Sequence, residues 1–202
     1  MMTENEASRM VYLHDVPIYT QGSMDMACGY YCALMFLTAM SEQFGKEYWG
    51  AGGAPEPLPF KPELFGPSGV GITVRRYKKS PGLFPIVNDV LSKYGLEQAT
   101  SPGKSSVWAG VVEAIRDERP SILRLPDSAH HPGGHYVVVK GYVPRTGARK
   151  ESLLVNDPST GEREIREAAV ATDSKPPASA LIARHRTWLR CQRSGKNEGR
   201  DL

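Results

Sequence analysis

HYVVVKGYV, residues 135–143, is the stretch that decides the fold, because its density of β-branched and aromatic residues predicts a strand. SLLVND, residues 152–157, is a second strand candidate that stops before Pro158. The connection between them, PRTGARKE, is polar and typical of a hairpin. An antiparallel hairpin would bring His135 and Asp157 to the same end of the ladder.

Three further segments extend this sheet in the prediction. Ser121–Leu125 is a short strand candidate directly before the hairpin. Val11–Tyr19 contains a proline and reads as an edge strand that leads into a turn at Gln21–Gly22. Ile165–Val170 is a candidate for one more element.

The helices are expected in the first half of the chain. In CGYYCALMFLTAMSEQF, residues 28–44, apolar side chains recur every three to four residues, which predicts a helix. Two more helices are expected at Leu83–Tyr94 and Ser105–Arg119, where Gly95 ends the first and Pro120 the second. Early helices followed by an antiparallel sheet indicate an α+β fold with segregated halves.

The composition is that of an ordinary globular chain. Of 202 residues, 40% are hydrophobic and 23% charged, and three cysteines are too few for a disulfide scaffold. The net charge of +3 is too small to indicate nucleic-acid binding, so we expect no nucleic-acid partner. We expect a disordered N-terminus at residues 1–10, one domain at 11–183 and a basic tail at 184–202.

A long irregular excursion is expected between the first two helices. Fourteen of the 38 residues from Gly45 to Gly82 are glycine or proline. Loops of this length are usually functional or mobile. We therefore expect this segment to lie near the site.

No segment has the character of a membrane anchor or a leader. The longest apolar stretch, Tyr30–Met40, is far shorter than the ~20 residues that a membrane span needs. The N-terminus lacks a basic start followed by an apolar run. We expect a cytoplasmic protein, or one exported without a cleaved signal peptide, and no membrane partner.

One combination of residues fits nucleophilic catalysis. Cys28 opens the first helix, where free N–H groups and the helix dipole stabilise a thiolate. His135 is the candidate base, and Gly133–Gly134 before it leave room for a substrate. Asp157 is the candidate group that orients the imidazole. The amide of Gln21, with the Cys28 N–H, would hold an oxyanion.

These residues stand in three stretches that resemble a known superfamily. VPIYTQGSMDMACGYYCALM (16–35), GGHYVVVKGY (133–142) and LLVNDPSTG (153–161) are similar to the motif regions of papain-like cysteine peptidases. The resemblance is closest to the bacteriocin-leader peptidases, which cut after double glycine. It implies a papain-like α+β fold in which the N-terminal helical part packs on the C-terminal sheet.

Residue by residue, the resemblance implies four roles. Cys28 is the nucleophile, His135 the base, Asp157 the orienting residue and Gln21 the oxyanion donor. The chain departs from the family at Ala27, where an aspartate often stands, and no exporter ATPase follows. We therefore expect a stand-alone cysteine peptidase that acts on a peptide or protein and needs no cofactor.

Alternatives remain at the level of the sequence. The same fold hosts thiol acyltransferases and deamidases, and an idle nucleophile would leave a non-catalytic peptide-binding module. Asn156 is an alternative to Asp157, but neighbouring strand residues face opposite sides, so only one of them reaches the histidine. Cys32 is expected in the core, and Cys191 in the tail. The set that could bind zinc comprises Cys28, Cys32, His130, His131 and His135.

Overall fold

A computed structural model describes residues 10–14, 16–20, 28–41, 44, 83–102, 107–126, 134–170 and 177–186. The predicted turn at residues 21–22, the excursion at 45–82 and most of the tail lie outside the described residues.

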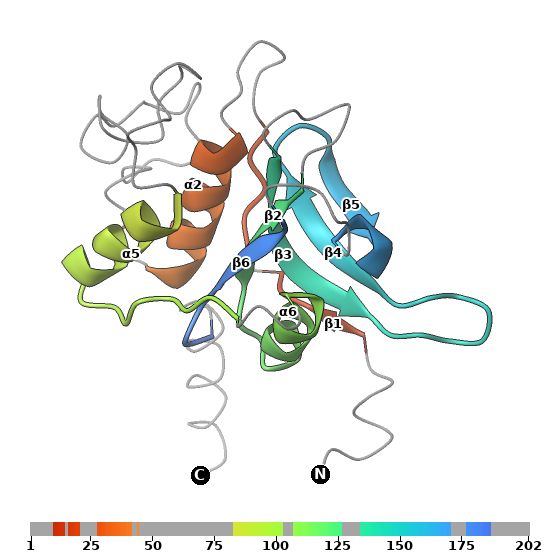
Figure 1. The fold of residues 1–202 in the computed structure, drawn as a ribbon. Helices are drawn as coiled ribbons and strands as arrows, with labels where there is room; N and C mark the ends of the chain where they lie inside the picture. Colours follow the sequence, from red (N-terminus) through yellow and green to blue (C-terminus); the bar gives the residue numbers. More distant parts are fainter. Residues whose placement is uncertain are drawn as a thin grey trace, which may run out of the picture.

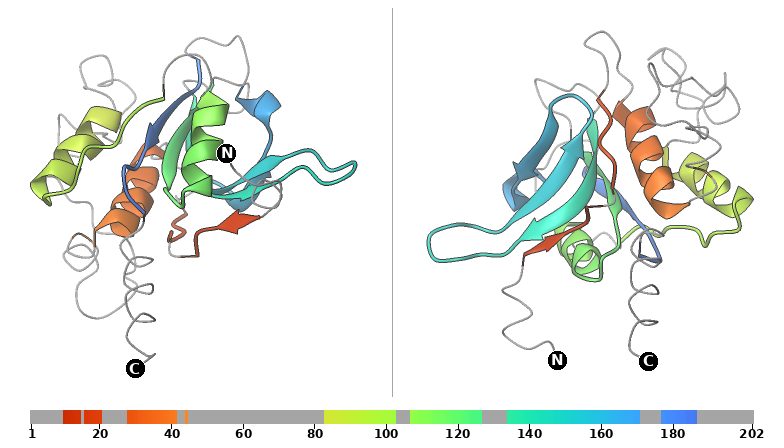
Figure 2. Two further views of the ribbon diagram at one scale, coloured as in Figure 1. Left: turned by 90° about the horizontal axis from the view of Figure 1, so that it is seen from below. Right: turned by 180° about the vertical axis from the view of Figure 1, so that it is seen from behind.

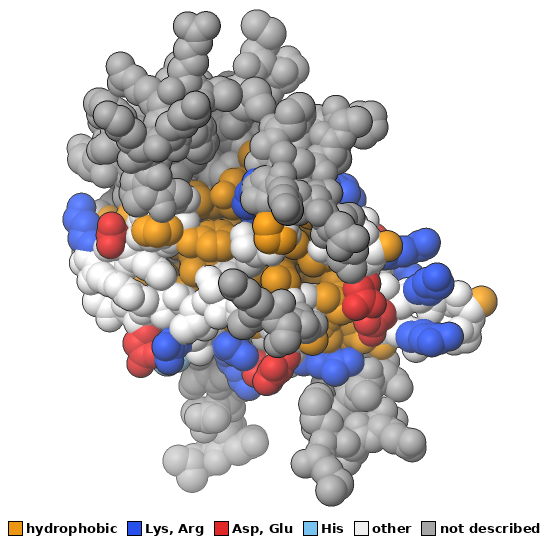
Figure 3. Space-filling model, viewed as in Figure 1, with side chains coloured by type: hydrophobic (Ala, Val, Ile, Leu, Met, Phe, Trp, Pro, Cys, Tyr) orange, Lys and Arg blue, Asp and Glu red, His pale blue; other side chains and the backbone are white. Residues whose placement is uncertain are grey.

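The centre of the molecule is a six-stranded antiparallel sheet in the order β5-β4-β3-β2-β6, with β1 also paired to β3 (Figure 1). The strands are β1 (Val11–Tyr12), β2 (Ser121–Leu125), β3 (His135–Val143), β4 (Ser152–Asp157), β5 (Gly161–Ile165) and β6 (Ser179–Ile182). The predicted bounds of β2, β3 and β4 are confirmed, and so is the hairpin of β3 and β4. Its polar turn projects from the molecule and carries Lys or Arg side chains on its surface (Figure 3). Arg145, Arg149 and Lys150 in this turn are exposed.

The register of the β3–β4 hairpin contains one irregularity. Val138 pairs with Asn156 and Val139 with Val155, but the next pair is Gly141 with Leu154. Lys140 is therefore an extra residue in β3, as in a β-bulge. The side chain of Lys140 lies within 2.5 Å of Glu162 on β5, which ties the bulge to the edge of the sheet.

The helix that carries Cys28 packs on this sheet. Helix α2 (Cys28–Met40) buries ten of its thirteen residues, as expected for a helix that is covered all round. It contacts β2 and β3, and α5 (Leu83–Lys93) packs against it in turn. Helix α6 (Val107–Arg116) lies on the other side of β2 and β3 (Figure 2).

Coverage from both sides explains why the middle of β3 is apolar. Val137, Val138 and Val139 are all 0% exposed, although successive strand residues face opposite sides of the sheet. The predicted α+β class, with the helix of Cys28 packed on an antiparallel sheet, is confirmed. None of the helices in the described ranges has the length and apolar character needed to span a bilayer.

Several predicted boundaries were wrong. Helix α2 ends at Met40. Phe44, the predicted end, is again helical after the break at Ser41, whose hydroxyl accepts the Phe44 N–H as a helix N-cap does. The first strand covers only Val11–Tyr12, and residues 16–20 are not in a strand. Helix α5 ends near Gly95, as predicted, where φ is +71°.

Three other segments also differ from the prediction. Helix α6 is described only from Val107 to Arg116, before Glu118 turns the chain with a φ of 61°. The candidate element at residues 165–170 is the end of β5 followed by a short 3-10 helix, Glu167–Ala169. Strand β6 was missed, because four residues are too few for a periodic signal.

The sheet core generates a stability prediction. Ile122 on β2 is 0% exposed and sits between strand partners on β3 and β6. Ile122→Ala should lower the free energy of unfolding by about 2–5 kcal/mol, because it removes buried methylene groups and leaves a cavity. The matched change Ile18→Ala truncates a side chain that is 46% exposed. It should change the free energy of unfolding by less than about 0.5 kcal/mol. Equal effects in urea denaturation would show that β2 is not in the core.

Candidate active site

His135 and Asp157 meet inside the protein, at the end of the β3–β4 ladder where the sequence placed them. His135 Nε2 lies 2.7 Å from Asp157 Oδ1, and the two residues are 2% and 1% exposed. The contact is an ion pair when the imidazole is protonated. Two residues 22 apart in sequence touch because β3 and β4 run antiparallel.

The alternation along the strands decides which side chain reaches the histidine. Asp157 shares a face of the sheet with Val155, whose partner Val139 shares a face with His135. Asn156 points the other way, and its amide donates to the backbone carbonyls of Pro17 at 2.7 Å and Val16 at 3.3 Å. Of the two candidates, Asp157 is therefore the residue that contacts His135.

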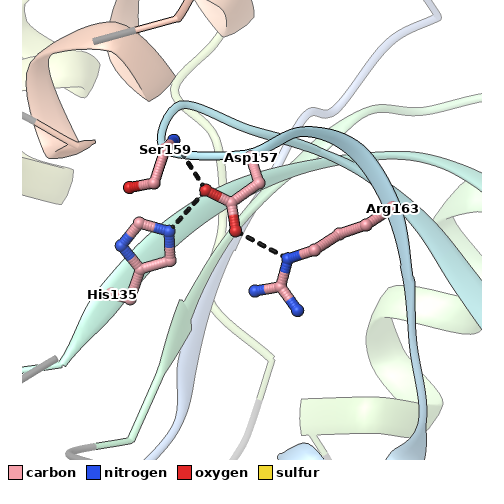
Figure 4. Close-up of polar contacts among 4 residues, drawn as sticks. All are labelled: His135, Asp157, Ser159 and Arg163. Carbon is pink, nitrogen blue, oxygen red and sulfur yellow. Dashed lines mark hydrogen bonds and ion pairs between the residues drawn. The ribbon is translucent and has the colours of Figure 1, made fainter. Parts of the chain in front are cut away.

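Asp157 has two further partners (Figure 4). The backbone N–H of Ser159 donates to Oδ1 at 2.8 Å, and Arg163 Nε donates to Oδ2 at 2.6 Å. Both carboxylate oxygens are thus occupied. Arg163 was not among the predicted site residues. The signal that could have found it is that Arg163 is the one basic residue of GEREI, residues 161–165, the stretch that follows the turn after Asp157.

These contacts move the pKa values of the pair apart. Burial alone would raise the pKa of Asp157, but the hydrogen bond and charge of His135, the Ser159 N–H and Arg163 together hold it well below its usual range. Burial likewise lowers the pKa of His135, but hydrogen bonds and charges of Asp157 and Cys28 outweigh it and raise the pKa to about 9. Near neutral pH the pair is therefore an imidazolium beside a carboxylate.

Cys28 is half-buried at the first residue of α2. It lies close enough to His135 for the two side chains to interact through a hydrogen bond and through charge. Cys32, one helical turn further on, is fully buried in the core as predicted. Burial, with the nearby Cys28 and Asp157, raises the pKa of the Cys32 thiol, so this second cysteine stays protonated.

Gly134 is the described member of the predicted glycine pair. Its φ is +84°, and a Cβ there would lie 2.7 Å from the Leu125 carbonyl oxygen and 2.8 Å from Arg124 Nη2. The backbone that enters β3 therefore needs glycine for its conformation and for this close packing. Gly133 and Gln21 lie outside the described residues.

The described residues alone do not form the predicted zinc site. Within them, no group of three or more His, Cys, Asp or Glu side chains is arranged to hold a metal ion. His130 and His131, two of the proposed ligands, lie outside those ranges. What the described residues do bring together is a thiol, an imidazole and a carboxylate, the arrangement that activates a sulfur nucleophile.

Comparison with known protein families gives a match. The model of the Peptidase_C39 like family matches residues 13–175, which include Cys28, His135 and Asp157. No curated protein matches the chain.

The raised pKa of His135 generates a prediction about stability and pH. The imidazole binds its proton up to about pH 9 in the folded protein but only to about pH 6.5 when unfolded. The stabilisation is therefore fully present below pH 6.5 and is lost as the pH rises to 9. The free energy of unfolding should fall by roughly 1–3 kcal/mol across this window.

Two histidine variants test this assignment by urea denaturation at several pH values. His135→Gln, which carries no titrating ring, should flatten the curve between pH 6.5 and 9. His14→Gln changes an exposed histidine and should leave the slope as it is. The assignment is wrong if His135→Gln keeps the full pH dependence.

Proposed function

Because the chain belongs to the Peptidase_C39-like family, we propose that it is a papain-like cysteine peptidase that cleaves a peptide or amide bond with Cys28, His135 and Asp157. The observation that carries this proposal is the buried pair of His135 and Asp157, 2.7 Å apart, beside a half-buried cysteine at a helix N-terminus. A peptide or a protein is the proposed substrate.

Cys28 is the proposed nucleophile. Its place at the first residue of α2 puts the sulfur near N–H groups that have no partner within the helix and near the positive end of the helix dipole. The imidazolium of His135 adds a full positive charge beside it. The thiolate is the form of a cysteine that attacks a carbonyl carbon.

The reaction then follows from the geometry of the histidine. Nε2 faces Asp157, so Nδ1 is the ring nitrogen that exchanges protons at the reacting centre. The Cys28 thiolate adds to the carbonyl carbon, and His135 gives its proton to the departing amine as the C–N bond breaks, leaving a thioester. His135 next takes a proton from water, whose oxygen attacks the thioester, and the thiolate leaves. The products are a carboxylic acid and an amine.

Asp157 orients the imidazole throughout this cycle. Its anionic carboxylate stabilises the imidazolium and keeps Nε2–H pointed at Oδ1. Gln21 is the proposed oxyanion donor, on the strength of its place seven residues before Cys28 in the motif. Its amide N–H and the backbone N–H of Cys28 would stabilise the negative oxygen of the tetrahedral intermediate.

The first test of this proposal removes the sulfur. Cys28→Ala should lower turnover of a mixed peptide library, followed by mass spectrometry, by more than about 10⁴-fold while the circular dichroism spectrum stays unchanged. The matched variant Cys32→Ala should keep turnover, because Cys32 is buried in the core. Undiminished cleavage by Cys28→Ala would rule out the thiol mechanism.

A thiol reagent separates catalysis from simple binding. In the wild-type protein at pH 7, iodoacetamide should label Cys28 faster than Cys32 and Cys191. If Cys28 reacts no faster than Cys191 in the same sample, the non-catalytic binding module is the better description.

The second test addresses the oxyanion. Gln21→Ala should reduce kcat about 10²–10³-fold with a small change in KM, because the lost hydrogen bond acts on the intermediate. The rate of Cys28 alkylation by iodoacetamide should stay within about twofold, since that reaction forms no oxyanion. If alkylation falls as much as hydrolysis, Gln21 supports the structure of the site and not the intermediate.

A further inference from the structure

The carboxylate that orients His135 is itself held by an arginine from the neighbouring strand. We propose that Arg163 is a positioning residue for the reaction: it clamps Oδ2 of Asp157 so that Oδ1 stays aligned with His135 Nε2. This inference rests on the proposed function, because it assigns a role within that same site.

The place of Arg163 follows from the pairing of β4 and β5. Val155 on β4 pairs with Arg163, and Asp157 pairs with Gly161. Val155 and Asp157 face the same side of the sheet, so the Arg163 side chain projects on the side of Asp157 and His135. It reaches the carboxylate diagonally across the ladder, over the position where Gly161 offers no side chain.

The neighbours of Arg163 on β5 face the other side. Glu162 accepts hydrogen bonds or ion pairs from Tyr12 at 2.8 Å and Lys140 at 2.5 Å. Glu164 accepts from Ser152 at 2.8 Å and pairs with Arg149 at 2.5 Å. The strand therefore sends one cation toward the candidate triad and two anions away from it.

The clamp has a mechanical consequence for the carboxylate. A carboxylate turns about its Cβ–Cγ bond, and contacts on Oδ1 alone leave that rotation less restricted. The Nε–Oδ2 contact of 2.6 Å holds the second oxygen, and Figure 4 shows the guanidinium and the imidazole on opposite ends of the carboxylate. With both oxygens held, the acceptor stays aimed at the histidine.

Arg163 could act on His135 through its charge or by positioning Asp157, and the two effects change the pKa of His135 in opposite directions. Among the described residues, the charged or titratable side chains around His135 are Cys28 and Cys32 on α2, Asp157 on β4, Arg163 on β5 and, beside Gly134, Arg124 on β2. Loss of a cation near an imidazolium would raise the histidine pKa. Loss of alignment with Asp157 would lower the histidine pKa, because the hydrogen bond that the imidazole donates to Asp157 is a main reason why this pKa is raised.

The experiment compares Arg163→Met, Arg163→Lys and the control Arg149→Met in the full chain. The pKa of His135 is measured by NMR titration, and the rate of Cys28 alkylation by iodoacetamide is measured at pH 7 by mass spectrometry. Arg163→Met should lower the pKa of His135 from about 9 toward its ordinary value of about 6.5, and slow alkylation about tenfold.

The other two variants separate position from charge and from general stability. Arg163→Lys keeps a donor and a charge without the planar guanidinium, so both quantities should lie between those of Arg163→Met and wild type. Arg149→Met removes an arginine that pairs with Glu164 on the opposite face, and should leave both unchanged. If Arg163→Met does not fold, Arg163→Lys alone decides by the same two measurements.

The outcomes keep the two proposals apart. An unchanged or raised pKa of His135 in the folded Arg163 variants overturns the positioning role. If wild-type Cys28 reacts no faster than the thiol of glutathione, the proposed function fails, and the titration of His135 still decides whether Arg163 aligns the pair. If wild-type Cys28 reacts fast and the Arg163 variants match it in both readouts, the proposal about Arg163 fails alone.

Discussion

A carboxylate that is 1% exposed is the constraint on which the rest of this site depends. Burying a charge is costly unless hydrogen bonds and an opposite charge compensate it. Asp157 obtains that compensation from His135 on β3, the Ser159 N–H of the turn and Arg163 on β5. The order β3-β4-β5 places all three donors within reach of the carboxylate. The sheet topology therefore supplies the contacts that compensate the buried charge.

The proposed nucleophile reaches this pair from a different part of the fold. Cys28 belongs to a helix, whereas His135 and Asp157 belong to a sheet, and their contact depends on how α2 packs against β3. Ten buried residues hold that helix in place, and rigid elements position reacting groups more accurately than loops. The apolar core and the chemistry of the site are thus coupled: the packing of α2 sets the distance from sulfur to imidazole.

Much of this arrangement could be predicted from local signals. The bounds of β3 and β4 follow from dense β-branched runs and from Pro158, and the hairpin follows from the polar stretch between them. The end of α2 and the existence of β6 could not be predicted so well. Helix α2 breaks at Ser41, whose hydroxyl accepts the N–H of the helical residue Phe44, and β6 gains its stability from pairing with β2 and not from its four residues.

The sequence by itself determined which residues were available: a cysteine at a helix start, a histidine at a strand start and an aspartate at a strand end. Only the tertiary structure decided that Asp157 and not Asn156 faces the histidine, and that Arg163 completes the group. The physical reason is register. A shift of one residue turns every side chain to the other face, and the pairing of β4 with β5 and the extra residue at Lys140 are settled only when the strands pack together.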